Sequence, residues 1–200
     1  MARPRRGVGI PAKDRLEDAF WHMLAEKPFT DMTISALSNR AGVNHNTFYY
    51  YYESLDDMAQ KLLVKNLIPE LPERVLDAFT GGQLDPEQIF GDEDILLRFR
   101  HLSLMAGPHG TAWMVDALKR AVMELWFDSF GIQQSDLDIQ QEMILTFIIS
   151  GLLAVVGKYG REAVPSQFGF IMESGLGQGI LASFSQISES TNAGKRGLSA

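Results

Sequence analysis

Apolar residues recur every three or four positions along most of this 200-residue chain. Leu16, Phe20 and Met23, for example, share one face of a helix that begins near Asp14, and Pro28 ends it. No segment of useful length alternates apolar and polar residues, which is the pattern of a half-buried strand. We therefore expect an all-α fold.

Longer helical patterns follow the N-terminal region. One begins at Ser54 and is expected to kink or end at Pro69 and Pro72. The others span residues 94–106, 111–130, 138–159 and 167–187. The stretch 144–156 is apolar on all sides, and such a helix must be covered on more than one side. In a chain this short, a partner subunit is the expected cover. Residues 1–12 have no apolar period and are expected to form a flexible basic arm, and residues 188–200 a disordered tail.

The charge is unevenly distributed. The whole chain carries −7, which by itself argues against a nucleic-acid binder. Residues 1–66 hold nine Lys and Arg against eight Asp and Glu, however, whereas residues 67–200 hold nine against 17. This asymmetry indicates two tasks in one chain. The alternative explanation is a basic N-terminus beside an otherwise random distribution of charged residues.

Several protein classes are excluded by composition. The chain has no cysteine, so it has no disulfide, no thiol nucleophile and no Cys-ligated metal. The start of the sequence lacks the apolar stretch of a signal peptide. The longest apolar run, residues 143–156, is interrupted by Thr146, Ser150 and Gly151 and is shorter than a membrane span. We expect a cytoplasmic protein without a membrane partner.

Residues 33–52 have the spacing of a helix-turn-helix. Thr33 is placed to cap a short helix, Gly42 supplies the left-handed position after it, and Asn44 is placed to cap a second short helix. In a helix-turn-helix the second helix enters the major groove of DNA. Short helical hairpins with a glycine turn are also common, so the pattern alone leaves DNA binding open.

The second short helix has one apolar face and one polar face. Phe48 and Tyr52 are expected to point inward. The outward side chains are then His45, Asn46, Tyr49 and Tyr50. Asn46 can pair bidentately with adenine, and the hydroxyls of Thr47, Tyr49 and Tyr51 suit phosphate oxygens. The residues expected to contact DNA are Thr33, Ser35, Asn44, His45, Asn46, Thr47, Tyr49, Tyr50 and Tyr51.

A stretch of about 50 residues resembles the DNA-binding domain of the TetR family of bacterial transcriptional regulators. The stretch runs from Asp14 to Lys65. The matching segments are 19–20, 28–29, 33–34, 37–43, 44–52 and 54–58, of which residues 41–49 are the most specific. One position departs from the family pattern, because Leu55 stands where the family usually has a lysine. This removes a charged phosphate contact and leaves the arginine arm to compensate.

The resemblance implies a domain organisation. It implies an N-terminal three-helix DNA-binding domain at residues 13–54, and a larger helical ligand-binding and dimerisation domain at residues 55–187. It also implies a homodimer, formed through helices near residues 138–159 and 167–187. By the same analogy, His45, Asn46, Tyr49 and Tyr50 lie at base contacts, and Thr33, Thr47 and Tyr51 at phosphate contacts.

The larger domain offers apolar side chains but no catalytic set. We find no nucleophile elbow, no phosphate loop and no paired-histidine zinc helix, and we expect no metal and no cofactor. The candidates for lining a ligand pocket are His101, Met105, Trp113 and Phe147. A plain hydrophobic core would account for most of these residues equally well.

The expected function is that of a DNA-binding regulator. We expect a repressor that a small apolar or aromatic effector releases from a palindromic double-stranded DNA operator. A DNA-binding regulator without a ligand, and a helical enzyme with an incidental helix-turn-helix, are the alternatives.

Overall fold

The computed structural model describes residues 10–74, 92–160, 174–180, 182–183 and 185–187. Within these residues every regular element is a helix, which confirms the all-α prediction. In chain order the elements are α1 (Ala12–Glu26), η1 (Phe29–Asp31), α2 (Ile34–Arg40), α3 (His45–Tyr51), α4 (Leu55–Asn66), α7 (Glu93–Ala106), α8 (Ala112–Phe130), η2 (Gln134–Asp136) and α9 (Ile139–Tyr159). The expected arm and tail, and most of the pattern 167–187, lie wholly or partly outside the described residues.

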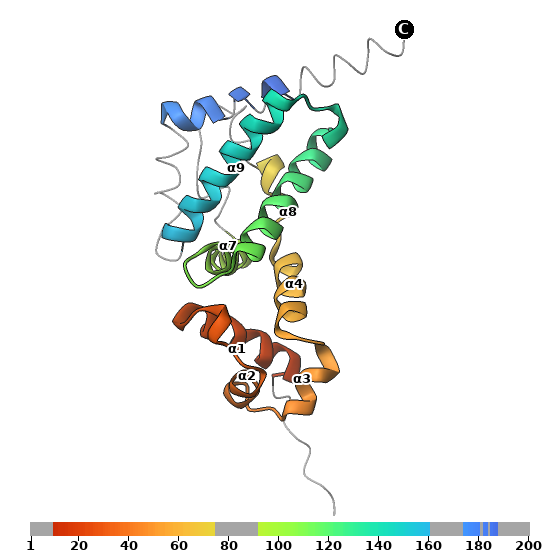
Figure 1. The fold of residues 1–200 in the computed structure, drawn as a ribbon, viewed down its shortest axis with the longest axis vertical. Coiled ribbons are helices and arrows are strands. Elements are labelled where there is room, and N and C mark those ends of the chain that lie inside the picture. The colour runs from red at the N-terminus through yellow and green to blue at the C-terminus, as the bar shows by residue number, and fades with distance from the viewer. Residues whose placement is uncertain (1–9, 75–91, 161–173, 181, 184, 188–200) are drawn as a thin grey trace, which may run out of the picture.

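Helices α1, α2 and α3 form a compact unit at one end of an elongated molecule (Figure 1). We call this unit, residues 12–51, the head. Its centre is made by fully buried side chains from all three helices, among them Phe20, Leu37 and Phe48. Burying apolar side chains of this size is the main source of stability for such a small unit.

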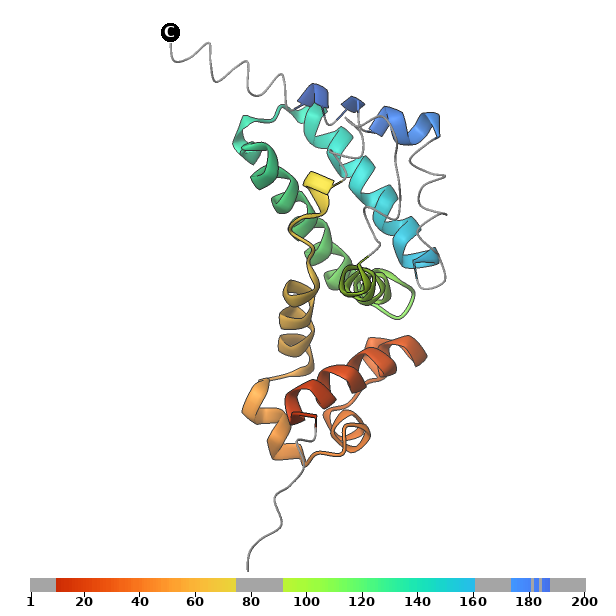
Figure 2. The same ribbon diagram turned by 180° about the vertical axis from the view of Figure 1, so that it is seen from behind.

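Helix α4 leaves the head and runs toward helices α7, α8 and α9, which pack on one another and which we call the body (Figures 1 and 2). Helix α7 lies between the two parts and contacts both α1 and α4. One hydrophobic core continues from the head through α4 to Met105 and Met114 in the body. The head is therefore packed against the body rather than tethered to it.

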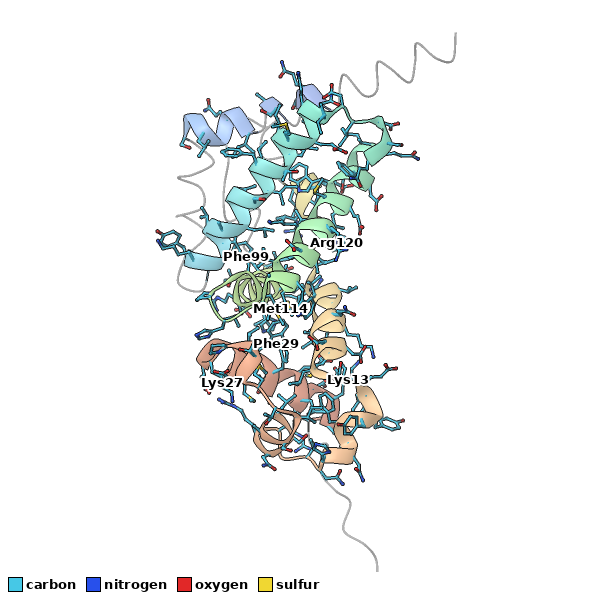
Figure 3. The ribbon with its side chains drawn as sticks, viewed as in Figure 1. Lys13, Lys27, Phe29, Phe99, Met114 and Arg120 are labelled. Carbon is cyan, nitrogen blue, oxygen red and sulfur yellow. The ribbon has the colours of Figure 1, made fainter. Side chains whose placement is uncertain are left out.

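A chain of aromatic contacts follows this junction. Trp113 of α8 meets Phe29, Phe29 meets Phe20, and Phe20 meets Trp21, with ring centroids 5.1–6.3 Å apart in edge-on geometry. Trp21 in turn stacks on His101 of α7, with centroids 4.1 Å apart. The backbone N–H of Phe29 also donates to the carbonyl of His109 at 2.8 Å. Figure 3 shows Phe29 and Met114 at this junction.

Helix α9 exposes much of its apolar surface in the single chain. It is 21 residues long. Its most apolar stretch of 18 residues has a mean hydropathy of 1.8, and 22 % of that stretch is buried. Among the described helices it meets the length and composition of a membrane span, a criterion that core helices of soluble proteins also meet. The apolar segment is longer than the interrupted run 143–156 that the sequence analysis counted.

Candidate nucleic-acid interface

Helices α2 and α3 are capped as their sequence predicts. The Thr33 hydroxyl accepts a hydrogen bond from the N–H of Ala36 at 3.2 Å, and the Asn44 side-chain oxygen accepts one from the N–H of Thr47 at 3.1 Å. Each cap satisfies one of the backbone donors that the first turn of a helix leaves free. Gly42 between them has φ +62°, the left-handed conformation that favours glycine.

The turn between α2 and α3 is held from outside by α1. Arg15 donates from one guanidinium nitrogen to the carbonyl oxygens of Ala41 and Gly42, at 3.0 and 3.1 Å. The local sequence does not single out Arg15 for this role. Arg15 holds the turn through a hydrogen bond to a residue 26 positions later in the chain, and a local sequence pattern cannot predict such a long-range contact.

Helix α3 presents one buried face and one exposed face. Phe48 and Tyr52 are buried, as predicted. Tyr49 is 52 % exposed and Tyr50 81 % exposed, and His45 and Asn46 are also exposed. The structure thus brings the four outward residues to one surface.

The remaining predicted DNA contacts border the same surface. Thr33, Ser35 and Asn44 are exposed at the starts of α2 and α3, whereas Thr47 and Tyr51 are half-buried. Leu55, at the position where the family usually has a lysine, is half-buried and packs against the core.

A buried carboxylate fixes the end of α3 relative to α1 and α4. The Tyr52 hydroxyl donates to Glu17 at 2.9 Å, and the Lys65 ammonium donates to the other oxygen of the same carboxylate. Burial, together with the bond to Glu17, raises the pKa of Tyr52 well above its usual value. The tyrosine therefore stays a hydrogen-bond donor. The sequence analysis did not single out Glu17, whose two partners lie 35 and 48 residues away.

The lysines and arginines of this region all have internal partners. There are six between residues 10 and 66. Arg40 pairs with Glu26 through two nitrogens, Lys61 with Asp57, and Lys65 with Glu17. Lys13 lies 3.9 Å from Glu17, while Lys27 and Arg15 donate to backbone carbonyls. A DNA phosphate would have to displace these partners, so hydroxyls and helix N-termini are the phosphate donors already free at this surface.

The four predicted pocket residues do not converge. Met105 is fully buried in the core, and Phe147 is 77 % exposed on α9. His101 is half-buried between Trp21 and Asn66, whose side-chain oxygen lies 2.8 Å from its Nδ1. Burial lowers the pKa of His101 to about 4, so the ring is neutral at pH 7.

Trp113 borders a groove between α4 and α8. The groove has a volume of about 760 Å³ and is lined by Asp56, Gln60, Trp113, Asp116, Ala117, Lys119 and Arg120. Arg120 is labelled on α8 in Figure 3. In the described part of the chain, no three His, Asp or Glu side chains are grouped as metal ligands.

A family model matches the N-terminal part of the chain. Residues 18–62 match the family model of bacterial regulatory proteins, tetR family. No curated protein matches the sequence. Among solved structures, the chain is similar to AlkX, a TetR family repressor from Dietzia sp. strain DQ12-45-1b implicated in biodegradation of n-alkanes. That similarity has 14 % identity and a TM-score of 0.40, and covers 91 % of this chain and 99 % of AlkX.

The matched segment contains the whole of α2, the turn and α3, and it ends within α4. It coincides with the part of the molecule that carries the capped helices and the exposed polar face. Residues 18–62 of this chain are therefore similar to the N-terminal region of bacterial regulatory proteins of the tetR family, and in this chain they contain a helix-turn-helix.

Proposed function

We propose that this chain is a homodimeric repressor that a small ligand releases from a near-palindromic operator. The observation that carries the proposal is the exposed face of α3, on which four side chains able to hydrogen-bond stand on a helix that is rigidly capped and tied to α1 and α4. In the proposed complex α3 enters the major groove. A dimer would place its two recognition helices about 34–36 Å apart, one turn of the duplex.

Helix α9 supports the dimer. Ile139, Met143 and Phe147 are spaced four residues apart, and each is at least 67 % exposed. Gly151 and Ala154 continue along the same side and are exposed, and no atom lies within 4 Å of a Cβ placed on Gly151. Small residues let a second helix approach closely, and a second copy of α9 would cover the stripe.

The effector is proposed to act through the junction between head and body. The aromatic contacts from Trp113 to His101 and the shared core couple the two parts. A ligand that binds one arrangement of body and head more tightly by about 1–3 kcal/mol would change DNA affinity by roughly 5- to 150-fold. A ligand that binds only the folded protein must also raise its melting temperature, which separates this proposal from a regulator without an effector.

DNA binding is tested by an electrophoretic mobility shift with the DNA upstream of the gene for this protein. We expect Tyr49→Ala to lose sequence-dependent binding while remaining dimeric by analytical ultracentrifugation. Leu97→Ala is the matched control, because Leu97 is 50 % exposed on α7, away from α3. Binding by Tyr49→Ala equal to that of the wild type would overturn the assignment of α3 as the DNA-contacting surface.

The dimer is tested by introducing a charge into the stripe on α9. Phe147→Asp is expected to sediment as a folded monomer, because a buried and unpaired carboxylate would make association unfavourable. In the single chain the side chain is exposed, so the helical circular dichroism should not change. Leu97→Asp, on α7, is the control and should stay dimeric. A dimer in Phe147→Asp would place the interface elsewhere.

A further inference from the structure

The exposed face of α3 lacks the charged side chains that most often recognise G·C pairs. Its four outward residues, His45, Asn46, Tyr49 and Tyr50, include no Lys, Arg, Asp or Glu. Guanine is most often recognised through O6 and N7 by an arginine or lysine, and cytosine N4 donates to a carboxylate. The one charged side chain among residues 33–52, Arg40, lies in the last turn of α2 and is paired with Glu26.

Asn46 carries the free amide on this face. Within the described chain its side chain makes no hydrogen bond, whereas the side-chain oxygen of Asn44, two residues before it, is occupied in the helix cap. An exposed amide has one donor and one acceptor in the arrangement that matches N7 and N6 of adenine. The free amide of Asn46 is therefore matched to an adenine.

The tyrosines offer aromatic surface beside this amide. The ring of Tyr49 packs edge-on against His45, with centroids 5.2 Å apart, and against the buried ring of Phe48 at 5.6 Å. These contacts hold the ring of Tyr49 in place before DNA binds, which lowers the entropy cost of ordering it. An apolar surface in the major groove is complementary to the C5-methyl group of thymine.

We propose that the base pairs beneath α3 in each operator half-site are A·T, with Asn46 recognising an adenine through N6 and N7 and Tyr49 packing against a thymine methyl group. The inference rests on the proposed function, since it specifies the DNA that this same surface binds. It makes the specificity of the protein depend on one amide and one aromatic ring rather than on charged side chains.

The first test selects duplexes from a randomised pool with the full-length protein. We expect A·T at the half-site positions whose preference disappears in Asn46→Ala, and we expect Asn46→Arg to select guanine at the adenine position. Asn39→Ala, which truncates an exposed asparagine near the end of α2, is the matched control and should select the wild-type sequence. A G·C preference at those positions, or an unchanged adenine in Asn46→Arg, would overturn the inference.

The second test changes single atoms in the selected duplex. Replacing the adenine by 7-deazaadenine removes N7, and should weaken wild-type binding by roughly 5- to 150-fold with no further effect on Asn46→Ala. Replacing the thymine by deoxyuridine removes its methyl group, and should weaken the wild type but not Tyr49→Ala. If the modified base weakened DNA binding equally in the wild type and in the matching variant, the assigned contact would be overturned. An absence of any sequence-dependent binding would instead overturn the proposed function, so the two failures are distinguishable.

Discussion

At the scale of single residues, the head depends on polar groups that are not on the exposed face of α3. Glu17 is buried on α1 and accepts from both Tyr52 and Lys65, so one carboxylate joins three helices. Glu26, on the same helix, pairs with Arg40 at an exposed position. The two glutamates differ in solvent exposure. Burial decides how much the loss of one partner of an ion pair lowers the free energy of unfolding.

Glu17→Ala is expected to lower the free energy of unfolding by about 1–3 kcal/mol, because Tyr52 and Lys65 lose a shared acceptor at a buried site. Chemical denaturation measures this change. Glu26→Ala is the control and should leave the stability nearly unchanged, because water can solvate the exposed guanidinium of Arg40 once its partner is removed. If Glu17→Ala and Glu26→Ala lowered the free energy of unfolding by similar amounts, the burial of Glu17 would not increase its contribution to stability.

At the scale of elements, the turn between α2 and α3 sets the direction of the recognition helix. Gly42 has a positive φ, and Arg15 lies directly over it and bonds its carbonyl. A Cβ at Gly42 would lie 3.3 Å from the Arg15 guanidinium nitrogen. Gly131, after α8, has almost the same φ of +61°, with no atom within 4 Å of the corresponding Cβ.

Gly42→Ala is expected to destabilise the protein by about 1–2 kcal/mol, because an L-residue is strained at this φ. It should also weaken DNA binding, because the added methyl group crowds the contact of Arg15 with the turn. Gly131→Ala carries the same backbone strain at an uncrowded place. It should lose similar stability yet bind the operator as the wild type does, as thermal melting and a mobility shift can establish. Unchanged DNA affinity in both variants would contradict a positioning role for the turn.

At the scale of the whole molecule, head and body meet at His101. Its ring stacks on Trp21 of α1 and bonds Asn66 at the end of α4, so it joins α7 to two other helices. Burial is the largest influence on the pKa of His101, and Asp18, Lys65, Glu17 and His22 act on it with opposing signs. The net result is a pKa of about 4 in the folded state, against an ordinary value of 6.5.

The stability of the folded protein should therefore depend on pH through His101. Above pH 6.5 the ring is neutral in both folded and unfolded chains. Between pH 6.5 and about 4 only the unfolded chain binds the proton, so the free energy of unfolding falls as the pH falls. After allowance for partial exposure, the loss is about 1–2 kcal/mol.

The variant that isolates this effect is His101→Phe, which keeps an aromatic ring against Trp21 and removes the titrating group. Denaturant titrations at pH 7 and pH 5 should show a smaller loss of stability in the variant than in the wild type. His45→Gln, which replaces an exposed histidine on α3, is the control and should leave the wild-type dependence intact. An equal pH dependence in wild type and His101→Phe would contradict the burial-induced shift.

Much of the fold follows from neighbouring residues alone. Apolar spacing located the helices, and the caps at Thr33, Asn44 and Ser54 and the left-handed Gly42 occur where the local sequence predicts them. The exposed face of α3 was predictable for the same reason. Once Phe48 and Tyr52 are buried, helical geometry determines which side chains face outward. These features depend on interactions within one or two helical turns.

Other features were decided only by the tertiary structure. Arg15 at the turn, Glu17 between three helices and His101 against Trp21 join residues 26 to 80 positions apart, and no periodic pattern encodes such pairs. Packing also separated the predicted pocket residues, burying Met105 and leaving Phe147 exposed. By itself the sequence determined the helices and the chemistry of the exposed face of α3. The packing of distant helices decided which side chains hold that face in place, because burial and ion pairing depend on what surrounds a group in space.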